Sequence, residues 1–119
     1  MNAAQVQQQV STHRVEMVTL HPVIQLGQVV GTRAFVALFS DETQLNTAVH
    51  LVLDKYRFGD WGLVSIRSKA LNDEALDPST PGRVFAKYSI KAPTGRYVDI
   101  FVLTEWDRSA TTLMLAEDY

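Results

Sequence analysis

The spacing of apolar residues changes abruptly along this chain of 119 residues. In the middle of the chain, apolar residues recur at the i, i+3, i+4, i+7 intervals that place side chains on one face of a helix. These residues are Leu45, Ala48, Val49, Val52, Leu53 and Tyr56. After residue 82, apolar residues occupy every second position instead, as on a strand with one buried face. These are Val84, Ala86, Tyr88 and Ile90. The change predicts an α+β domain in which a C-terminal antiparallel β-meander packs against two or three helices.

Capping residues set the expected helix boundaries. Asp41 followed by Gln44 matches a capping box and predicts a helix over about 42–57. A second helix is predicted over 65–76, with Ser65 as its cap and with Ile66, Ala70 and Leu71 facing inward. The run 32–40 can form a helix or a strand, and Thr32 as a cap favours the helix.

The expected strands follow from β-branched and apolar runs. Residues 83–90, 97–105 and 110–115 are the strands of the predicted meander, and 97–105 is apolar enough to be covered on both faces. Upstream, 15–20 reads as a short strand and 23–31 as a strand with a bulge at Gly27. We expect a flexible tail over 1–13 and a single domain over 14–119.

Composition narrows the possible functions. The chain has no cysteine, a net charge of -2 and a pI near 5.8. These values remove thiol chemistry and give no basic footprint for direct nucleic-acid binding. No apolar run approaches the roughly 20 residues of a membrane span, and the N-terminus lacks the pattern of a signal peptide. We therefore expect a cytoplasmic protein that does not bind membranes.

Candidate catalytic groups are sparse. The three histidines, His13, His21 and His50, show no metal-binding spacing, and no strand-turn nucleophile motif occurs. A catalytic triad of His50 with a distant serine and a distant aspartate remains an alternative. The sequence predicts no enzyme, no metal site and no cofactor.

The stretch TEWDRSATT, 104–112, is the main candidate site. Its first interpretation is a turn between two strands with satisfied polar groups. Its second is a docking surface, because Trp and Arg dominate binding hot spots. In that interpretation Trp106 and Arg108 point to one side and stack, while Glu105 and Asp107 take the other side.

The loop GDWG, 59–62, is the second candidate. Trp61 is expected to fill the core while the two glycines let the loop bend, and a surface role is the alternative. Asp60 is a candidate partner for Arg108, and Glu105 is the other. The predicted binding residues are therefore Trp106, Arg108, Asp107, Glu105 and Asp60.

Several of these segments together resemble one known family. They are GDWG, then Asn72, Ala75-Leu76 and Gly82-Arg83, then TEWDRSATT, and finally Glu117-Asp118-Tyr119. The pattern over about 23–119 is similar to small proteins of plasmids and integrated elements, labelled plasmid-related proteins or putative toxins tied to an antisense RNA. Family members usually have acidic residues after GDWG and a proline near position 116, where this chain has LVSIRSK and Ala116.

The resemblance implies a role for a mobile element and supplies no catalytic residue. The first hypothesis is a non-enzymatic protein that binds and inhibits a host defence complex, as anti-CRISPR and anti-restriction proteins do. Its partner would be a host protein or a ribonucleoprotein complex. The alternative is the toxin of a plasmid type I toxin-antitoxin system. An enzyme is the third and least supported hypothesis.

Overall fold

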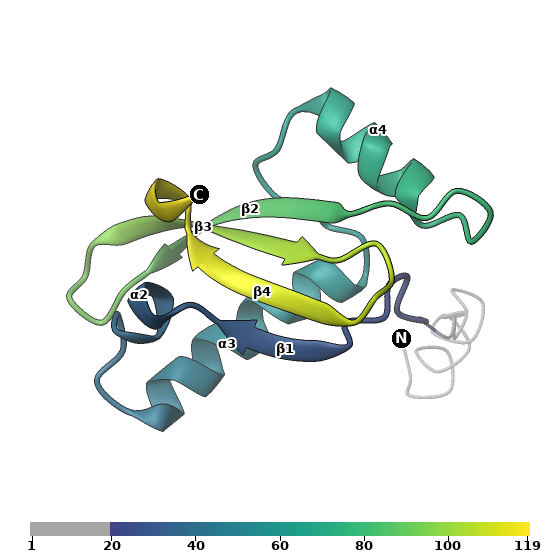
Figure 1. Ribbon diagram of the computed structural model, residues 1–119. Coiled ribbons are helices and arrows are strands. Elements are labelled where there is room, and N and C mark those ends of the chain that lie inside the picture. The colour runs from purple at the N-terminus through teal and green to yellow at the C-terminus, as the bar shows by residue number, and fades with distance from the viewer. Residues whose placement is uncertain (1–19) are drawn as a thin grey trace, which may run out of the picture.

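A computed structural model describes residues 20–119 (Figure 1). In chain order the elements are β1 (Gln28–Gly31), α2 (Arg33–Val36), α3 (Glu42–Arg57), α4 (Ile66–Ala75), β2 (Val84–Lys91), β3 (Tyr97–Thr104), β4 (Ala110–Leu115) and a final 3-10 turn, η1 (Ala116–Asp118). The α+β prediction is confirmed. The predicted tail over 1–13 and nearly all of the predicted strand over 15–20 lie outside the described residues.

The four strands form one mixed sheet in the order β1-β4-β3-β2. The predicted meander is confirmed, because β2, β3 and β4 pair antiparallel in sequence. Strand β1 joins β4 in parallel, with Val30 opposite Thr112, which the sequence did not predict. The predicted strand over 23–31 is too long. It begins only after Gly27, whose φ is +61° and whose added Cβ would lie 2.3 Å from the Arg108 carbonyl oxygen.

Helix α3 forms where the capping residues predicted. The Asp41 carboxylate accepts the Gln44 N–H at 2.8 Å, and the Gln44 side chain accepts the Ser40 N–H at 2.9 Å. These bonds satisfy N–H groups at the helix start that have no partner within the helix. The inner side of α3 buries Val52, Leu53 and Tyr56.

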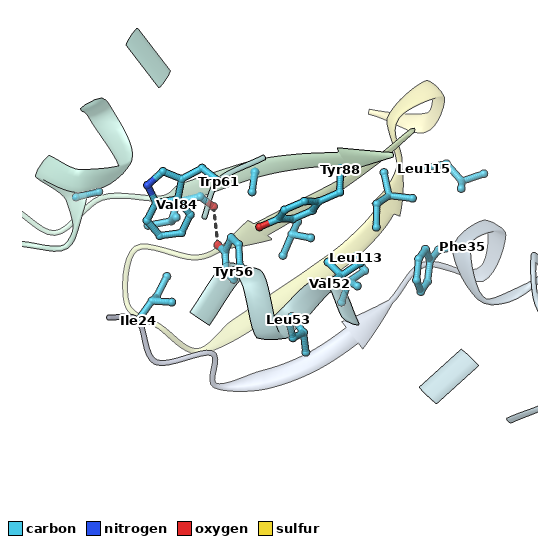
Figure 2. Packing of buried hydrophobic residues seen from close by; sticks show 14 residues of the cluster. Ile24, Phe35, Val52, Leu53, Tyr56, Trp61, Val84, Tyr88, Leu113 and Leu115 are labelled. Carbon is cyan, nitrogen blue, oxygen red and sulfur yellow. Dashed lines mark hydrogen bonds between the residues drawn. The ribbon is translucent and has the colours of Figure 1, made fainter. Parts of the chain in front are cut away.

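The core lies between α3 and one face of the sheet (Figures 1 and 2). The sheet contributes the alternating residues of its strands, which are Val84, Ala86 and Tyr88 of β2, Ile100 and Val102 of β3, and Leu113 and Leu115 of β4. Trp61 closes one end of this core and is 3% exposed. Its ring meets that of Tyr56 edge to face at 5.4 Å, so the prediction that Trp61 fills the core is confirmed.

The opposite face of the sheet is covered by its own aromatic side chains. The rings of Phe85 and Phe101 lie 4.6 Å apart, and Tyr119 packs on both from the C-terminus. Next to them on β3, Leu103 is buried. The apolar character of β3 thus reflects helix packing on one side and aromatic packing on the other.

Helix α4 begins at its predicted cap, Ser65, but it presents a different face to the domain. Ile66, Ala70 and Leu71 were expected to face inward, but all three are exposed, Ile66 by 86% and Leu71 by 53%. The buried residues of α4 are instead Asn72 and Ala75. The Asn72 amide donates to the Phe85 carbonyl at 2.7 Å and accepts the Phe85 N–H at 3.0 Å. The prediction was wrong because this helix docks on the backbone of β2 through a polar side chain, which apolar spacing does not reveal.

A buried chain of hydroxyl groups joins the helix layer to the sheet. The Tyr56 hydroxyl lies 2.7 Å from the Thr104 hydroxyl and donates to the Val84 carbonyl. Thr104 in turn contacts Thr111 at 2.7 Å, and Thr111 donates to the Leu26 carbonyl. Burial raises the pKa of Tyr56 to about 12, because the phenolate would lose its hydration.

The raised pKa of Tyr56 makes stability fall at high pH. Folding favours the neutral phenol, so the full contribution is present below the unfolded pKa of about 10 and is lost as pH rises toward 12. We expect this one group to reduce the free energy of unfolding by at most about 1.4 kcal/mol per pH unit in that window. Denaturant titrations from pH 8 to 11 would measure the slope. Tyr56→Phe should show a shallower slope, and an unchanged slope would contradict the assignment.

None of the helices found in residues 20–119 has the length and apolar character needed to cross a bilayer.

Candidate docking surface

The stretch 104–112 forms a tight turn between β3 and β4. The Glu105 N–H donates to the Ala110 carbonyl at 3.0 Å, and the Arg108 N–H donates to the Glu105 carbonyl at 2.9 Å. The Asp107 carboxylate accepts the Ser109 N–H at 3.0 Å. The hydroxyl and N–H of Ser109 together hold the pKa of Asp107 below its usual range. The interpretation as a structural turn with satisfied polar groups is confirmed.

Arg108 fixes this turn to the rest of the domain. Its backbone has a φ of +60°, a conformation that costs energy for any residue with a side chain. Its guanidinium donates to the carbonyls of Gly82 at 2.6 Å, Ala75 at 2.7 Å and Glu105 at 3.2 Å. Ala75 is the last residue of α4, where carbonyls lack partners within the helix. Arg108 therefore ties the β3–β4 turn to the end of α4 and to the start of β2.

The predicted orientation of Arg108 was wrong. We expected its guanidinium to stack beside Trp106 and to pair with Glu105 or Asp60. Among residues 20–119 the ion pairs are instead Arg83 with Glu105, at 3.4 Å, and Lys87 with Asp99. The left-handed backbone at position 108 breaks the assumed strand-like alternation, and the guanidinium is occupied by backbone carbonyls.

Trp106 lies at the surface beside a groove. Its side chain is 60% exposed, the larger exposure of the two tryptophans. The groove has a volume of about 370 Å³ and runs between the turn, the segment before β1 and the loop after α4. It is lined by Val23, Ile24, Gln25, Ala75, Leu76, Asp77, Pro78, Pro81, Trp106, Asp107 and Arg108. We call this surface the Trp106 groove.

The groove combines apolar walls with two carboxylates. Asp77 accepts the N–H and the hydroxyl of Ser79, and these bonds lower its pKa, as Ser109 does for Asp107. Both carboxylates are therefore ionised at neutral pH. Arg108 donates to carbonyl oxygens and forms no ion pair with either carboxylate among residues 20–119, so two negative charges and one positive charge line the groove. A cationic group next to apolar contacts would be attracted to this surface.

The predicted site residues are only partly brought together. Trp106, Asp107 and Arg108 line the groove, and Glu105 and Asp60 do not. The Asp60 carboxylate accepts the Gly62 N–H within the GDWG loop, and its carbonyl accepts the Tyr88 hydroxyl. Sequence reasoning missed Val23, Pro78 and Pro81. The two prolines lie in a polar loop and Val23 lies between Pro22 and Ile24, so nothing in the sequence placed these three residues beside the turn.

In the part of the chain that the structure describes, no three His, Cys, Asp or Glu side chains cluster so as to hold a metal ion. The Trp106 groove offers apolar contact area and charged side chains, which suit the binding of a partner.

Comparisons of the chain with protein-family models, with curated proteins and with solved structures each give no match, so the resemblance to mobile-element proteins stays a prediction.

Proposed function

We propose that this is a non-enzymatic binding protein of a mobile element, which docks through the Trp106 groove on a protein component of a host defence complex and inhibits it. The observation that carries the docking step is an exposed tryptophan on a turn that backbone and side-chain hydrogen bonds hold in place. The mobile-element context comes from the sequence resemblance, and the defence target is proposed because the chain has the small size, mild acidity and lack of cysteine of anti-defence inhibitors. The proposed inhibition would act against either a CRISPR complex or a restriction enzyme.

The rigidity of the turn supports binding. Asp107 holds the turn internally, and Arg108 holds it to α4 and to Gly82. A preorganised anchor loses little conformational freedom when it binds, so more of its contact energy appears as affinity. Tryptophan is among the residues most enriched in binding hot spots.

The chemistry of the groove favours a particular partner segment. The Trp106 ring can receive a cation over its face, and Asp77 and Asp107 add two negative charges nearby. The apolar walls, Val23 and Pro81 among them, suit an aliphatic stem. An arginine or lysine beside apolar residues on the partner would satisfy all three features.

Trp106→Ala separates binding from folding. Because the side chain is exposed, we expect the free energy of unfolding to change by less than about 1 kcal/mol. Binding to the partner should weaken by about 2 kcal/mol, or roughly 30-fold. Chemical denaturation and titration with the purified defence complex would measure the two effects. Leu71→Ala is a matched control, because Leu71 is also a large exposed apolar residue and lies outside the groove.

The biological role is tested by expression in hosts with and without an active CRISPR or restriction system. We expect incoming phage or plasmid DNA to be protected only where the defence system is active, and Trp106→Ala to abolish that protection. Growth arrest in the host without defence would favour the toxin of a type I system and overturn the proposal. Protection that survives Trp106→Ala would retain the role but remove the groove from it.

A further inference from the structure

One edge of the sheet is open. The N–H groups of Gln28 and Thr32 donate to carbonyls of Ser109 and Leu113, each at 3.0 Å. Successive residues of a strand direct their backbone groups to opposite sides, so those of Val29 and Gly31 point away from β4. Within residues 20–119, these outward groups have no hydrogen-bond partner.

The other edge of the sheet is closed over the first half of β2. Asn72 takes both backbone groups of Phe85. The Lys87 N–H donates to the Trp61 carbonyl at 3.3 Å, and its carbonyl accepts the Leu63 N–H at 2.7 Å. Helix α4 and the loop around Trp61 therefore cover the β2 edge of the sheet. Among the described residues, no element covers the β1 edge in this way.

The side chains of β1 add little to the protection of this edge strand, whose main safeguard is its length of only four residues. Natural edges commonly carry lysine, proline or a bulge that prevents pairing with another strand. The sequence of β1 is QVVG, and Val29 and Val30 are 40% and 37% exposed. Beside it lies a hollow of about 230 Å³ with no charged residue in its lining, which is Val29, Val30, Gly31, Phe35, Val36, Leu45, Asn46, Val49 and Leu113.

We infer that β1 pairs with β1 of a second copy of this chain, antiparallel about a two-fold axis at Val30. Val29 then lies opposite Gly31 of the second copy, and each such pair exchanges two hydrogen bonds between the outward backbone groups. The two Val30 side chains meet at the axis in a close non-hydrogen-bonded pair. The two sheets become one continuous sheet with an isologous interface.

The edge is complementary to itself in charge and in shape. Because the strand is uncharged, two identical copies place no like charges opposite each other. A Cβ at position 31 would lie 3.1 Å from the Phe35 ring and 3.2 Å from Val36, so a side chain here would be tightly packed. Val36 beside it is 41% exposed and is the side chain of one copy that Val29 of the other can contact. A basic foreign segment would find no carboxylate here.

The register has little freedom. Centring the axis on Val29 would place Gly31 opposite Gly27, whose φ of +61° is not extended and cannot continue the ladder. The axis at Val30 pairs extended residues only.

Analytical ultracentrifugation with charge-swap variants tests the pairing. The wild type should sediment at twice the chain mass of 13.3 kDa. Val30→Lys and Val30→Glu should each raise the dimer dissociation constant at least about tenfold, because like charges meet at the axis. A 1:1 mixture of the two variants should recover the dimer. Leu71→Lys, at an exposed apolar site on α4, should leave the dimer unchanged.

Val29→Pro is an independent variant that removes one outward N–H and leaves the bonds from β1 to β4 intact. We expect a monomer with an unchanged far-ultraviolet circular dichroism spectrum. A wild type that stays monomeric at its highest soluble concentration would overturn the inference. So would a folded Val29→Pro that remains dimeric, or a lysine–glutamate mixture that does not recover the dimer.

Discussion

Replacing Trp61 by alanine should lower the free energy of unfolding by about 3–5 kcal/mol. The side chain is 3% exposed, and its indole N–H donates to Asp73 at 3.0 Å. Its ring also packs edge to face on Tyr56. Truncation would leave a cavity between α3 and the sheet and would free α4 from one of its contacts. Urea denaturation followed by circular dichroism would measure the loss.

Trp61→Phe separates the packing from the hydrogen bond. It keeps an aromatic ring in the core, while removing the donor to Asp73 and part of the ring volume, so it should cost clearly less than alanine. A Trp61→Ala protein that kept its unfolding midpoint would show that Trp61 does not hold the core.

Replacing Arg108 by alanine should cost about 3 kcal/mol, in contrast to the small effect expected for an exposed arginine. The substitution removes charge-assisted bonds to the carbonyls of Gly82 and Ala75, which are the shortest that the guanidinium makes. It also leaves a non-glycine residue at a φ of +60° without the contacts that hold it there. Thermal and urea unfolding would measure the change.

Two further variants at position 108 separate the contributions of the hydrogen bonds, the backbone strain and the charge to this loss of stability. Arg108→Gly loses the same hydrogen bonds but relieves the backbone strain, so it should be more stable than Arg108→Ala by about 1 kcal/mol. Arg108→Lys keeps the charge and loses the fork that reaches two separate carbonyls. If Arg108→Ala unfolded at the wild-type midpoint, the guanidinium contacts would not matter for stability.

The parts of the fold that the sequence predicted depend on signals between near neighbours. The start of α3 was readable because Asp41 and Gln44 act on backbone groups within one turn. The meander was readable because its strands are consecutive and their inward residues alternate. Trp61 was predictable as a core residue because the two glycines near it allow the loop to bend and direct the side chain into the core.

The parts that were missed depend on partners far away in sequence. The inward face of α4 is set by Asn72 bonding to Phe85, a contact that has no apolar period. The position of the Arg108 guanidinium depends on carbonyls at Ala75 and Gly82, together with a left-handed backbone that arginine rarely adopts. One wall of the Trp106 groove comes from Val23 and another from Pro78, both distant from the turn itself. The binding role of these residues stays a prediction.

The parallel pairing of β1 with β4 also bears on how the chain acquires its structure during synthesis. Residues 28–31 leave the ribosome well before their partners, 110–113, are made. The nascent β1 therefore has no β4 to pair with until residues 110–113 have emerged, and closing so long a loop slows this pairing. During that interval an uncharged, apolar strand stays available to chaperones and to neighbouring nascent chains.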